Sequence, residues 1–443
     1  MAGNRVAPAR QVSLREHNLA LVLAEVADRG PVSRAGIAAA TGLTKATVSA
    51  LVDALAGAGL VTEQDRAPAT GAVGRPGAPL GLAPPGPVGI GLEINVDYLA
   101  TCTVDLSGEV RGRRVLAGDV RDRPQGAVLD LAAAAVAEAV DEARASGAEV
   151  AGLAVAVPGL VETRQPVLRL APNLGWHDVP VLDELRARLA DQGATGGPPM
   201  RLDDLPIRLD GLPMRLDGLP MRLDNEANLA ALGELWCGGH HTADDAPLTT
   251  FVHVSGEIGI GAGLVVGGRL FRGVRGFSGE IGHLPVRDCG PVCRCGSVGC
   301  LEQAAGQDAI LRAAGLEGRA GSVNGGGGGP LDELVAQAAA GRERAVGAIR
   351  DAGRWLGTGV AALVNVVDVD AVVLGGGFAR LAPWLRGPVE DELGRRVLSA
   401  QWAAPRVLVS ALGAQAAVRG AATSVVRDVI ADPAGYLARI ARP

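Results

Sequence analysis

The sequence predicts an α/β protein in which a small helical domain precedes a larger body of mixed strands and helices. Near the N-terminus, three short helical patterns are followed by strand and turn residues, while beyond residue 88 apolar strand patterns alternate with longer helical ones. The chain has 443 residues, of which 48% are hydrophobic and 20% charged. A chain of this length and composition is sufficient for roughly two or three domains, each with a core of its own.

Composition points to the cytoplasm as the compartment. The sequence contains no apolar run of membrane-spanning length, and its start, MAGNRVAPARQ, lacks the apolar stretch of a secretory signal. Residues 1–76 carry eight Lys/Arg and six Asp/Glu, whereas the whole chain has a net charge of −6. This mild excess of positive charge at the N-terminus favours a DNA partner for that region.

Residues 1–82 have the pattern of a winged helix-turn-helix DNA-binding domain. Three helical patterns follow one another, over residues 14–29, 34–41 and 45–58. Ser33 and Thr44 are predicted to cap the second and third helices, because their hydroxyl groups can accept hydrogen bonds from free N–H groups of the first turn. The third helix begins TKATVS, and short polar or basic side chains at that end can reach base edges and phosphates. The predicted DNA contacts on this helix are Thr44, Lys45, Thr47 and Ser49.

The residues after the third helix predict the wing. Residues 59–63, GLVTE, read as a strand, and the following GAVGRPG places Arg75 at a flexible tip suited to a contact with the minor groove or the DNA backbone. Three short helices alone could also form a bundle with no role in DNA binding. The strand and tip that follow them favour the winged form.

Residues 83–87, APPGP, form the predicted linker, because adjacent prolines and a glycine stop both helix and sheet. From Val88 an alternating pattern predicts two strands joined by a turn, and helices are expected at 127–145, 335–364 and 416–430. Residues 200–220 contain three seven-residue units, MRLDDLP, IRLDGLP and MRLDGLP, ahead of MRLDNEAN. We interpret these units as a tandem insertion at the surface, since the period is too short for a solenoid.

The segment 279–302, GEIGHLPVRDCGPVCRCGSVGCLE, has the composition of a loop held by a metal ion. It contains His283, Cys293, Cys295 and Cys300 in the spacing H-x9-C-x-C-x4-C. Three thiolates and one imidazole fill the tetrahedral coordination of Zn²⁺ and leave no position for water, so the ion is expected to be structural. Cys289 is a rival ligand, although the tighter cluster wraps one ion more readily. Ordinary buried cysteines without a metal are the alternative.

The same segment resembles the signature of the ROK family, which comprises repressors, open reading frames and sugar kinases. Members of that family pair a GExGH element with CxCGxxGCxE, and residues 279–283 and 293–302 carry both. The resemblance implies that zinc holds the loop while Glu280 and Glu302 accept hydrogen bonds from sugar hydroxyls. It also implies a two-lobed actin-like sugar-kinase fold, with a small lobe at 88–199, a large lobe at 221–415, and residues 416–443 returning to the small lobe.

The resemblance extends to further sugar-site positions. Asn173, in PNLGW, and Asn225, Glu226 and His283 match family positions that contact a monosaccharide or lie beside it. The kinases of the family carry aspartate as the catalytic base where this chain has Glu226. The extra methylene moves the carboxylate, and a displacement of that order can cost about a hundredfold in rate.

A second departure lies at the first phosphate loop, where the kinases have DxGxT and this chain has Glu93, Asn95 and Asp97. A side chain at the glycine position obstructs a phosphate, and a carboxylate repels it. These are also ordinary hairpin residues. We therefore expect no enzymatic activity but a sugar-responsive transcriptional regulator, in the first place a repressor, that binds operator DNA and a monosaccharide. It is expected to be a homodimer or a higher homo-oligomer. The alternatives are an active ATP-dependent sugar kinase with an appended DNA-binding domain, and an activator or a regulator controlled by a protein partner.

Overall fold

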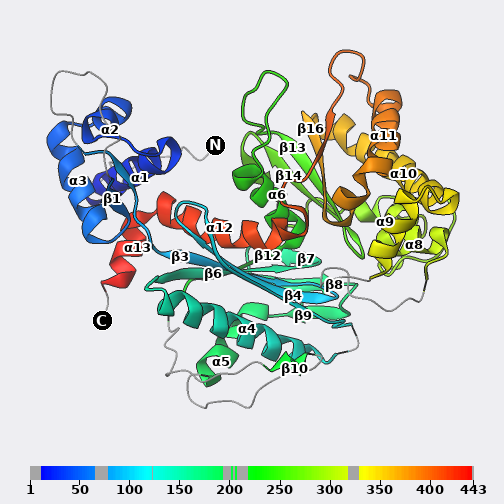
Figure 1. Ribbon diagram of the computed structural model, residues 1–443, viewed down its shortest axis with the longest axis horizontal. Helices are drawn as coiled ribbons and strands as arrows, with labels where there is room; N and C mark the ends of the chain where they lie inside the picture. The colour runs from blue at the N-terminus through cyan, green and yellow to red at the C-terminus, as the bar shows by residue number, and fades with distance from the viewer. Residues whose placement is uncertain are drawn as a thin grey trace, which may run out of the picture.

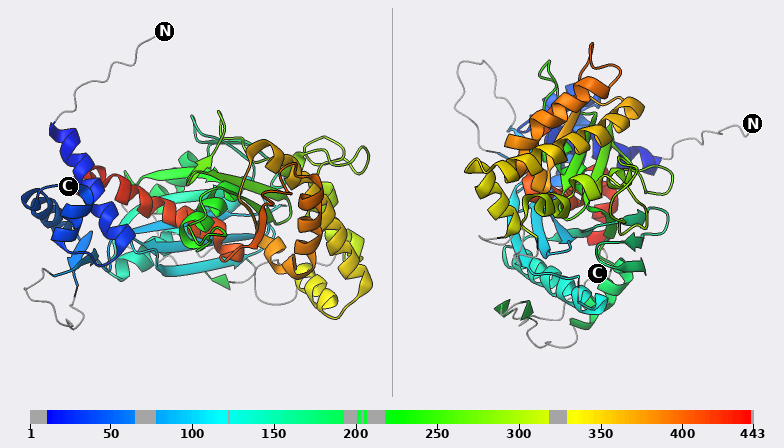
Figure 2. Two further views of the ribbon diagram at one scale, coloured as in Figure 1. Left: turned by 90° about the horizontal axis from the view of Figure 1, so that it is seen from above. Right: turned by 90° about the vertical axis from the view of Figure 1, so that its right-hand side faces the viewer.

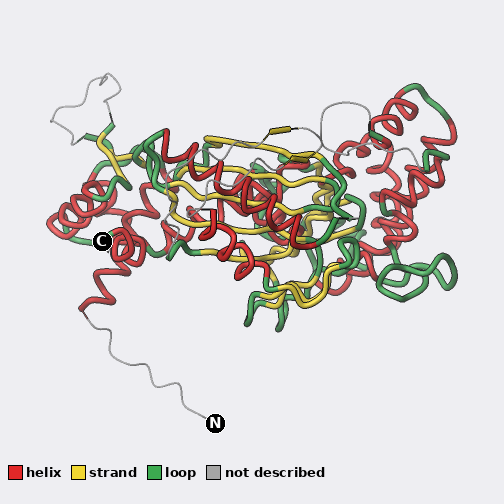
Figure 3. Tube along the Cα trace, turned by 90° about the horizontal axis from the view of Figure 1, so that it is seen from below, coloured by secondary structure: helices red, strands yellow, loops and turns green. Residues whose placement is uncertain are grey.

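The computed structural model describes residues 11–64, 78–121, 123–192, 201–202, 205–206, 218–317 and 329–441. The molecule is elongated, with helices at both ends and β-sheets between them (Figures 1, 2 and 3). The predicted DNA contact Arg75 and most of the insertion 200–220 lie outside the described residues. Two short pieces of the insertion, β10 (Arg201–Leu202) and β11 (Leu205–Pro206), pair antiparallel.

The N-terminal domain has the predicted helix-turn-helix order. Its elements are α1 (Gln11–Arg29), α2 (Arg34–Thr41), α3 (Lys45–Gly57), β1 (Val61–Glu63) and β2 (Leu80–Leu82). Ser33 Oγ accepts a hydrogen bond from Gly36 N at 3.1 Å, and Thr44 Oγ1 accepts one from Thr47 N at 3.2 Å, so both predicted caps are confirmed. The axes of α2 and α3 differ by 116°, and β1 pairs antiparallel with β2 to form the base of the wing.

The first lobe is built on a five-stranded sheet. Its elements are β3 (Val88–Ile94), β4 (Tyr98–Asp105), β5 (Val110–Ala117), α4 (Gln125–Ala145), β6 (Val150–Val157), α5 (Val181–Gln192) and β12 (Met221–Asn225). The strand order is β12-β6-β3-β4-β5, with β6 and β12 parallel to β3 and the other pairs antiparallel. A small antiparallel sheet of β7 (Leu160–Glu162), β8 (Val167–Ala171) and β9 (Trp176–Val179) follows β6.

The second lobe repeats the same topology. Its sheet has the order β15-β14-β13-β16-β17, in which β13 takes the place of β3. Its strands are β13 (Phe251–Gly256), β14 (Ile260–Val266), β15 (Arg269–Phe271), β16 (Ala371–Gly375) and β17 (Arg406–Val409). Its helices are α6 (Glu226–Cys237), η1 (Ile281–His283), α7 (Glu302–Ala305), α8 (Gln307–Ala314), α9 (Pro330–Ala339), α10 (Glu343–Val367), α11 (Gly376–Arg396) and η2 (Gly413–Gln415).

The C-terminal helices join the three parts. α12 (Ala416–Ala431) leaves the second lobe, crosses α6 and packs on β3, β4 and β6 of the first sheet (Figure 1). The crossing is close because Gly233 and Gly420 lie at it, and a Cβ on either residue would overlap the backbone of the other helix. α13 (Pro433–Ile440) and α12 then contact α1 of the DNA-binding domain. Of the helices in the described residues, none is both long and apolar enough by itself to cross a membrane, although the bent pair α2 and α3 passes a test of length and composition.

Two expectations about individual elements were wrong. The single helix expected at 335–364 is divided into α9 and α10, because Gly341 adopts a left-handed φ of 72° between them. The strands β3 and β4 do not alternate between core and solvent, since every residue in both is buried. α12 on one face and α4 on the other cover the sheet, so both faces of these strands are buried.

Candidate functional site

One cavity brings together all six residues predicted from the sugar-site pattern. It has a volume of about 340 Å³ and is lined from both lobes. The six residues are Asn173, Asn225, Glu226, Glu280, His283 and Glu302. They are spread over more than a hundred residues of sequence, and the duplicated fold gathers them. The volume falls within the range of pockets that hold small ligands.

The ends of secondary-structure elements position these side chains. Asn173 follows β8, and Asn225 and Glu226 stand where β12 passes into α6. Glu280 and His283 flank η1, while Glu302 opens α7. Polar groups at element ends are typical of binding sites, because regular backbone holds them in place while their side chains remain available.

Asn225 is largely committed to the fold. Its Oδ1 accepts hydrogen bonds from Ala227 N at 2.8 Å and Asn228 N at 3.2 Å, which caps α6. Its Nδ2 donates to Gly159 O at 2.9 Å and so ties the β6–β7 turn to the start of the helix. The remaining N–H of the amide is the group with which this residue could contact a ligand.

Glycines keep the cavity open on the side of the second lobe. A Cβ at Gly259 would lie 2.6 Å from Glu302 Oε2 and 2.9 Å from Asn173 Nδ2. A larger residue there would displace both polar groups. The glycine-rich run 256–263 therefore has a local function, which is to let β14 approach the site closely.

Carboxyl groups dominate the electrostatics of the cavity. Burial raises the pKa of Glu226 and of Glu257 well above the usual value, and the charge of Glu93 adds to both effects. Burial, followed by the charge of Glu302, raises the pKa of Glu280 to about 7. Glu226 Oε2 has no hydrogen-bond partner among the described residues. Such a wall offers acceptors and protonated donors to hydroxyl groups and disfavours a second anion.

Sequence reasoning missed several polar residues at this cavity. Glu257 lines it from the turn between β13 and β14, and Ser255 and Ser297 also line it. Arg294, in the cysteine loop, donates from Nη1 to Asn173 Oδ1 at 3.3 Å. The signal that could have identified Glu257 is its position as a charged residue within the glycine-rich stretch 256–261, GEIGIG.

The β3–β4 turn contributes a buried polar group beside the cavity. Tyr98 Oη donates to Glu93 Oε1 at 2.5 Å, and Asn95 Nδ2 contacts the same oxygen at 3.2 Å. Asn95 N donates to Tyr98 O and closes the turn, so the residue is a hairpin residue that also lines the cavity. Burial raises the pKa of Glu93 to about 7, against the opposing effect of these two hydrogen bonds.

Replacing Glu93 with glutamine is expected to stabilise the protein above pH 7. The unfolded chain loses the Glu93 proton near pH 4.5, whereas the folded chain holds it to about pH 7, so wild-type stability falls as pH rises through this window. The free energy of unfolding of Glu93→Gln, relative to wild type, should rise by about 2–3 kcal/mol between pH 4.5 and pH 8. Urea unfolding at both pH values measures this change. The exposed Glu109→Gln is the matched control, and an equal rise there would contradict the account.

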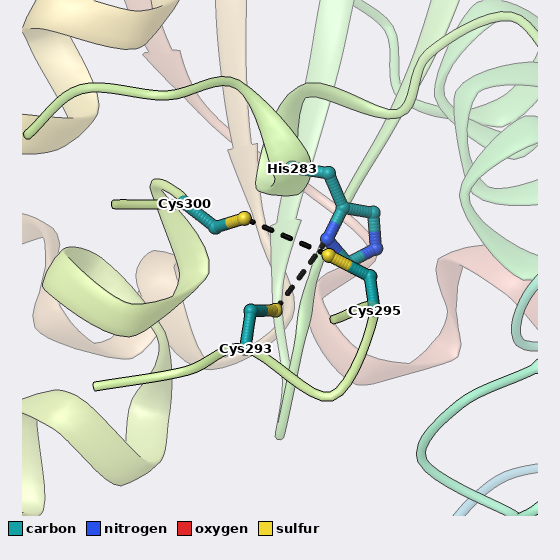
Figure 4. A group of neighbouring side chains, drawn as sticks. All are labelled: His283, Cys293, Cys295 and Cys300. Atoms are coloured by element: carbon teal, nitrogen blue, oxygen red, sulfur yellow. Dashed lines mark hydrogen bonds between the residues drawn. The ribbon is translucent and has the colours of Figure 1, made fainter. Parts of the chain in front are cut away.

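The four predicted metal ligands form a compact cluster. The ligand atoms of His283, Cys293, Cys295 and Cys300 all lie within 4.8 Å of one another (Figure 4). Cys295 Sγ and Cys300 Sγ are 3.7 Å apart, as are Cys293 Sγ and His283 Nδ1. In a tetrahedral site with metal–sulfur bonds of about 2.3 Å, two sulfurs lie about 3.8 Å apart, so these separations fit a metal ion. Cys289 is exposed and stands outside the cluster.

The loop that holds this cluster reaches directly into the cavity. Cys293 N donates to Ser297 O at 2.8 Å, and Leu301 N donates to Leu284 O at 2.8 Å, which fixes the loop against the segment after η1. Gly299 has a φ of 83°, and a Cβ there would overlap Arg287 O. His283 belongs both to the cluster and to the cavity lining, and Glu302 Oε1 lies 3.7 Å from Cys293 Sγ. The metal cluster and the cavity thus share a wall.

The predicted DNA-contacting residues occupy the start of α3. Thr44 and Lys45 are exposed, and Thr47 and Ser49 are half-buried. Thr44 Oγ1 and Thr47 Oγ1 lie 2.8 Å apart. The opposite side of α3, with Val48, Leu51 and Val52 among its residues, is buried in the core of the domain. This orientation leaves the N-terminal turn of α3 free to meet a ligand.

The glycine run at residues 375–377 has a packing explanation. Gly375 ends β16 against His253, and a Cβ there would overlap the imidazole ring. Gly376 forms an isolated parallel β-bridge with Gly256 of β13 and has a φ of 54°. These glycines let β16 turn into α11 beside β13.

Comparison with known proteins agrees with this architecture. The model of the ROK family matches residues 89–192 and 211–428, and that of the MarR family matches residues 20–70. The xylose repressor of Caldicellulosiruptor bescii is 29% identical over 436 residues, which covers 95% of this chain and 98% of that protein.

Solved structures show the same fold. A ROK family transcriptional regulator described as a homologue of the E. coli MLC protein aligns with a TM-score of 0.72 and 23% identity, over 96% of this chain and 99% of that one. A ROK family glucokinase from Streptomyces griseus, solved with glucose and AMPPNP, aligns with a TM-score of 0.60 and 26% identity, over 77% of this chain and 99% of its own. The family model covers well over half of the sequence, and the chain belongs to the ROK family.

Proposed function

We propose that this protein is a sugar-responsive transcriptional repressor that binds a monosaccharide between its lobes and operator DNA through α3. The observation that carries the proposal is the joint presence, in one chain, of a winged helix-turn-helix and a hydroxyl-matching cavity. The full-length similarity to a protein named as a xylose repressor supports it.

The polar groups of the cavity suit a neutral sugar. A pyranose presents hydroxyl groups that both donate and accept, and the lining provides carboxyl groups, amides and an imidazole in several directions. Glu226, Glu257 and Glu280 are half-buried acids with raised pKa values. The described residues that line the cavity include no lysine or arginine to balance a phosphate ester, and the nearby Arg294 is hydrogen-bonded to Asn173. We propose an unphosphorylated monosaccharide as the effector.

We propose Zn²⁺ as the ion of the His/Cys₃ cluster. Thiolates and an imidazole in tetrahedral spacing are the ligands that zinc prefers, and four protein ligands would complete its coordination. When bound, the ion would fix the loop that carries His283 and Glu302.

We propose that phosphoryl transfer has been lost. Such a reaction requires groups that position phosphate and neutralise its charge. Asn95 and the carboxyl group of Glu257 line the cavity instead, close to the carboxyl group of Glu93. One observation favours the other candidate function, a sugar kinase. Glu226 Oε2 is buried and has no hydrogen-bond partner among the described residues, and the pKa of Glu226 is raised, which are properties of a general base.

A thermal-shift panel tests the proposed ligand. We expect at least one neutral monosaccharide to raise the melting temperature, because a ligand that binds only the folded state stabilises it by mass action. The 6-phosphate or 5-phosphate of the same sugar should give no shift at equal concentration. A larger shift with the phosphate ester, or no shift with any sugar, would contradict the proposal.

Lys45→Ala is expected to weaken operator binding about equally for specific and random DNA. An exposed lysine at the start of a recognition helix neutralises a phosphate, and losing one such contact lowers the slope of log affinity against log salt by about 0.9. Fluorescence anisotropy at several salt concentrations measures the slope. Arg386→Ala, on α11 of the second lobe, removes the same charge far from α3 and should leave the slope unchanged.

We further propose that the protein binds operator DNA as a homodimer, in which each protomer contacts one of two half-sites.

A further inference from the structure

A second cavity, which we call the junction cavity, lies where the DNA-binding domain meets both lobes. Its volume is about 700 Å³, twice that of the sugar cavity. It is lined by α1, α6, α12, the end of β12 and the β14–β15 hairpin. Figure 1 shows these elements around the place where α1 faces the two lobes. The junction cavity shares no lining residue with the sugar cavity.

Apolar side chains form one part of its lining. Leu229, Leu232 and Trp236 present one face of α6, and Ala20 and Ala24 face the cavity from α1. The two alanines leave space that larger residues on α1 would fill. This surface suits an apolar ring or chain.

Positive charge forms the other part. Four arginines line the cavity, namely Arg222, Arg269, Arg272 and Arg427, against the two carboxylates Asp224 and Asp428. Arg272 donates to Asp224 Oδ2 at 2.7 and 3.1 Å, and Arg222 pairs with Asp428. The cavity therefore keeps an excess of two positive charges before His17, which also lines it, is considered.

Two of the arginines have no carboxylate partner among the described residues. The exposed side chain of Arg269 makes no ion pair or hydrogen bond there, and Arg427 lies over the ring of Trp236 at 5.6 Å from its centroid. Guanidinium groups that already rest on an aromatic ring still present their N–H edges to an anion. The net charge of the whole chain is −6, so this concentration of unpaired guanidinium groups is local.

We propose that the junction cavity binds a small organic anion with an apolar body, such as a carboxylate, sulfonate or phosphate carried on a ring. The anionic group faces Arg269 and Arg427, and the ring packs against Leu229, Leu232 and Trp236. Bidentate guanidinium contacts hold the charge, and the apolar wall selects the body.

Such a ligand would contact the regulatory parts of the molecule at once. The cavity that holds it is lined by α1 of the DNA-binding domain and by Asp224, the residue before Asn225 and Glu226 of the sugar cavity. Asp224 Oδ1 also accepts a hydrogen bond, at 3.0 Å, from Nδ2 of Asn228, which lies in α6. Binding at the junction would therefore bias how α1 sits on the lobes. This regulatory consequence rests on the proposed function, whereas binding of the anion does not.

Titration of the full-length protein with 8-anilinonaphthalene-1-sulfonate tests the binding. This probe joins a sulfonate to an aromatic body, and its fluorescence rises in an apolar site. We expect saturable binding at one site per chain. The neutral analogue N-phenyl-1-naphthylamine, which lacks the sulfonate, should bind at least tenfold more weakly.

The double variant Arg269→Ser/Arg427→Ser should bind the sulfonate at least tenfold more weakly than wild type. The matched control Arg354→Ser/Arg386→Ser removes two exposed arginines from α10 and α11 and should stay within twofold. Ala20→Trp, which fills the cavity from α1 without changing charge, should also abolish binding, with circular dichroism confirming the fold. Should Ala20→Trp fail to fold, the arginine pair decides alone.

Several results would overturn the proposal. One is an equal loss of sulfonate affinity in the two double arginine variants, and another is equal affinity of the wild type for the neutral probe and the sulfonate. A third is complete displacement of the sulfonate by a monosaccharide, which would place the sulfonate in the sugar cavity. Loss of operator affinity in Arg269→Ser/Arg427→Ser with unchanged probe binding would instead assign these arginines to the DNA backbone.

Discussion

A Cys295→Ser protein is expected to lose its bound zinc and to bind the effector monosaccharide at least tenfold more weakly, while wild-type protein carries one zinc per chain. Hydroxyl is a much poorer zinc ligand than thiolate, so three remaining ligands hold the ion weakly. Cys295 is exposed, and its replacement by the nearly isosteric serine removes little packing. The predicted loss therefore comes from the metal and not from the core.

The effect reaches the sugar because the loop supplies part of the cavity. His283 is a ligand of the cluster and also lines the cavity, and Glu302 follows the last cysteine ligand by two residues. Between η1 and α7 the loop has no helix or strand, and isolated backbone hydrogen bonds, such as those from Cys293 N to Ser297 O and from Val286 N to Gly299 O, hold its turns. Without the ion, this glycine-rich segment gains conformational freedom that sugar binding must then remove.

Cys289→Ser is the matched control, because Cys289 is an exposed thiol in the same loop but outside the cluster. It should keep one zinc and wild-type sugar affinity. Metal analysis by mass spectrometry and calorimetric sugar titration measure both quantities. Full zinc in Cys295→Ser, or loss of zinc in Cys289→Ser, would contradict the assigned ligand set.

Local signals made much of this structure predictable. The caps Ser33 and Thr44, the boundaries of α2 and the closeness of the four metal ligands follow from residue types at fixed spacings. Sequence reasoning also placed six residues that line one cavity, although that inference depended on a family resemblance.

The remainder depends on contacts that no local pattern encodes. Glu257 reaches the cavity because of the register of β13 and β14, and the division between α9 and α10 depends on the conformation of Gly341. The junction cavity exists only where α1, α6, α12 and two strands meet. Periodicity predicts that each element has an apolar face, but it does not predict which charged residues of separate elements will meet.

The second large effect concerns coupling between sugar and operator. A monosaccharide touching Asn173 of the first lobe and Glu302 of the second bridges the two lobes, so it favours one lobe arrangement. α6 and α12 carry the chain between the lobes and pack tightly at Gly233 and Gly420, and α12 contacts α1. We therefore expect a change in lobe arrangement to move the DNA-binding domain. We expect saturating sugar to weaken operator binding by about 5- to 150-fold.

Linkage makes this effect reciprocal, so operator DNA must weaken sugar binding by the same factor. Lys45→Ala should lower operator affinity while leaving the factor unchanged, because Lys45 lies on α3 and outside the sugar cavity. Cys295→Ser should reduce the response to a given sugar concentration without reducing operator affinity in the absence of sugar.

The most direct test of the central claim is an operator titration by fluorescence anisotropy, with and without the sugar that gives the largest thermal shift, run beside a coupled assay for ADP formation from ATP. The account predicts operator affinity that falls severalfold when the sugar is added and no turnover of ATP. An operator affinity that is indifferent to every sugar that binds, or sustained ATP turnover that Glu226→Gln abolishes, would contradict it.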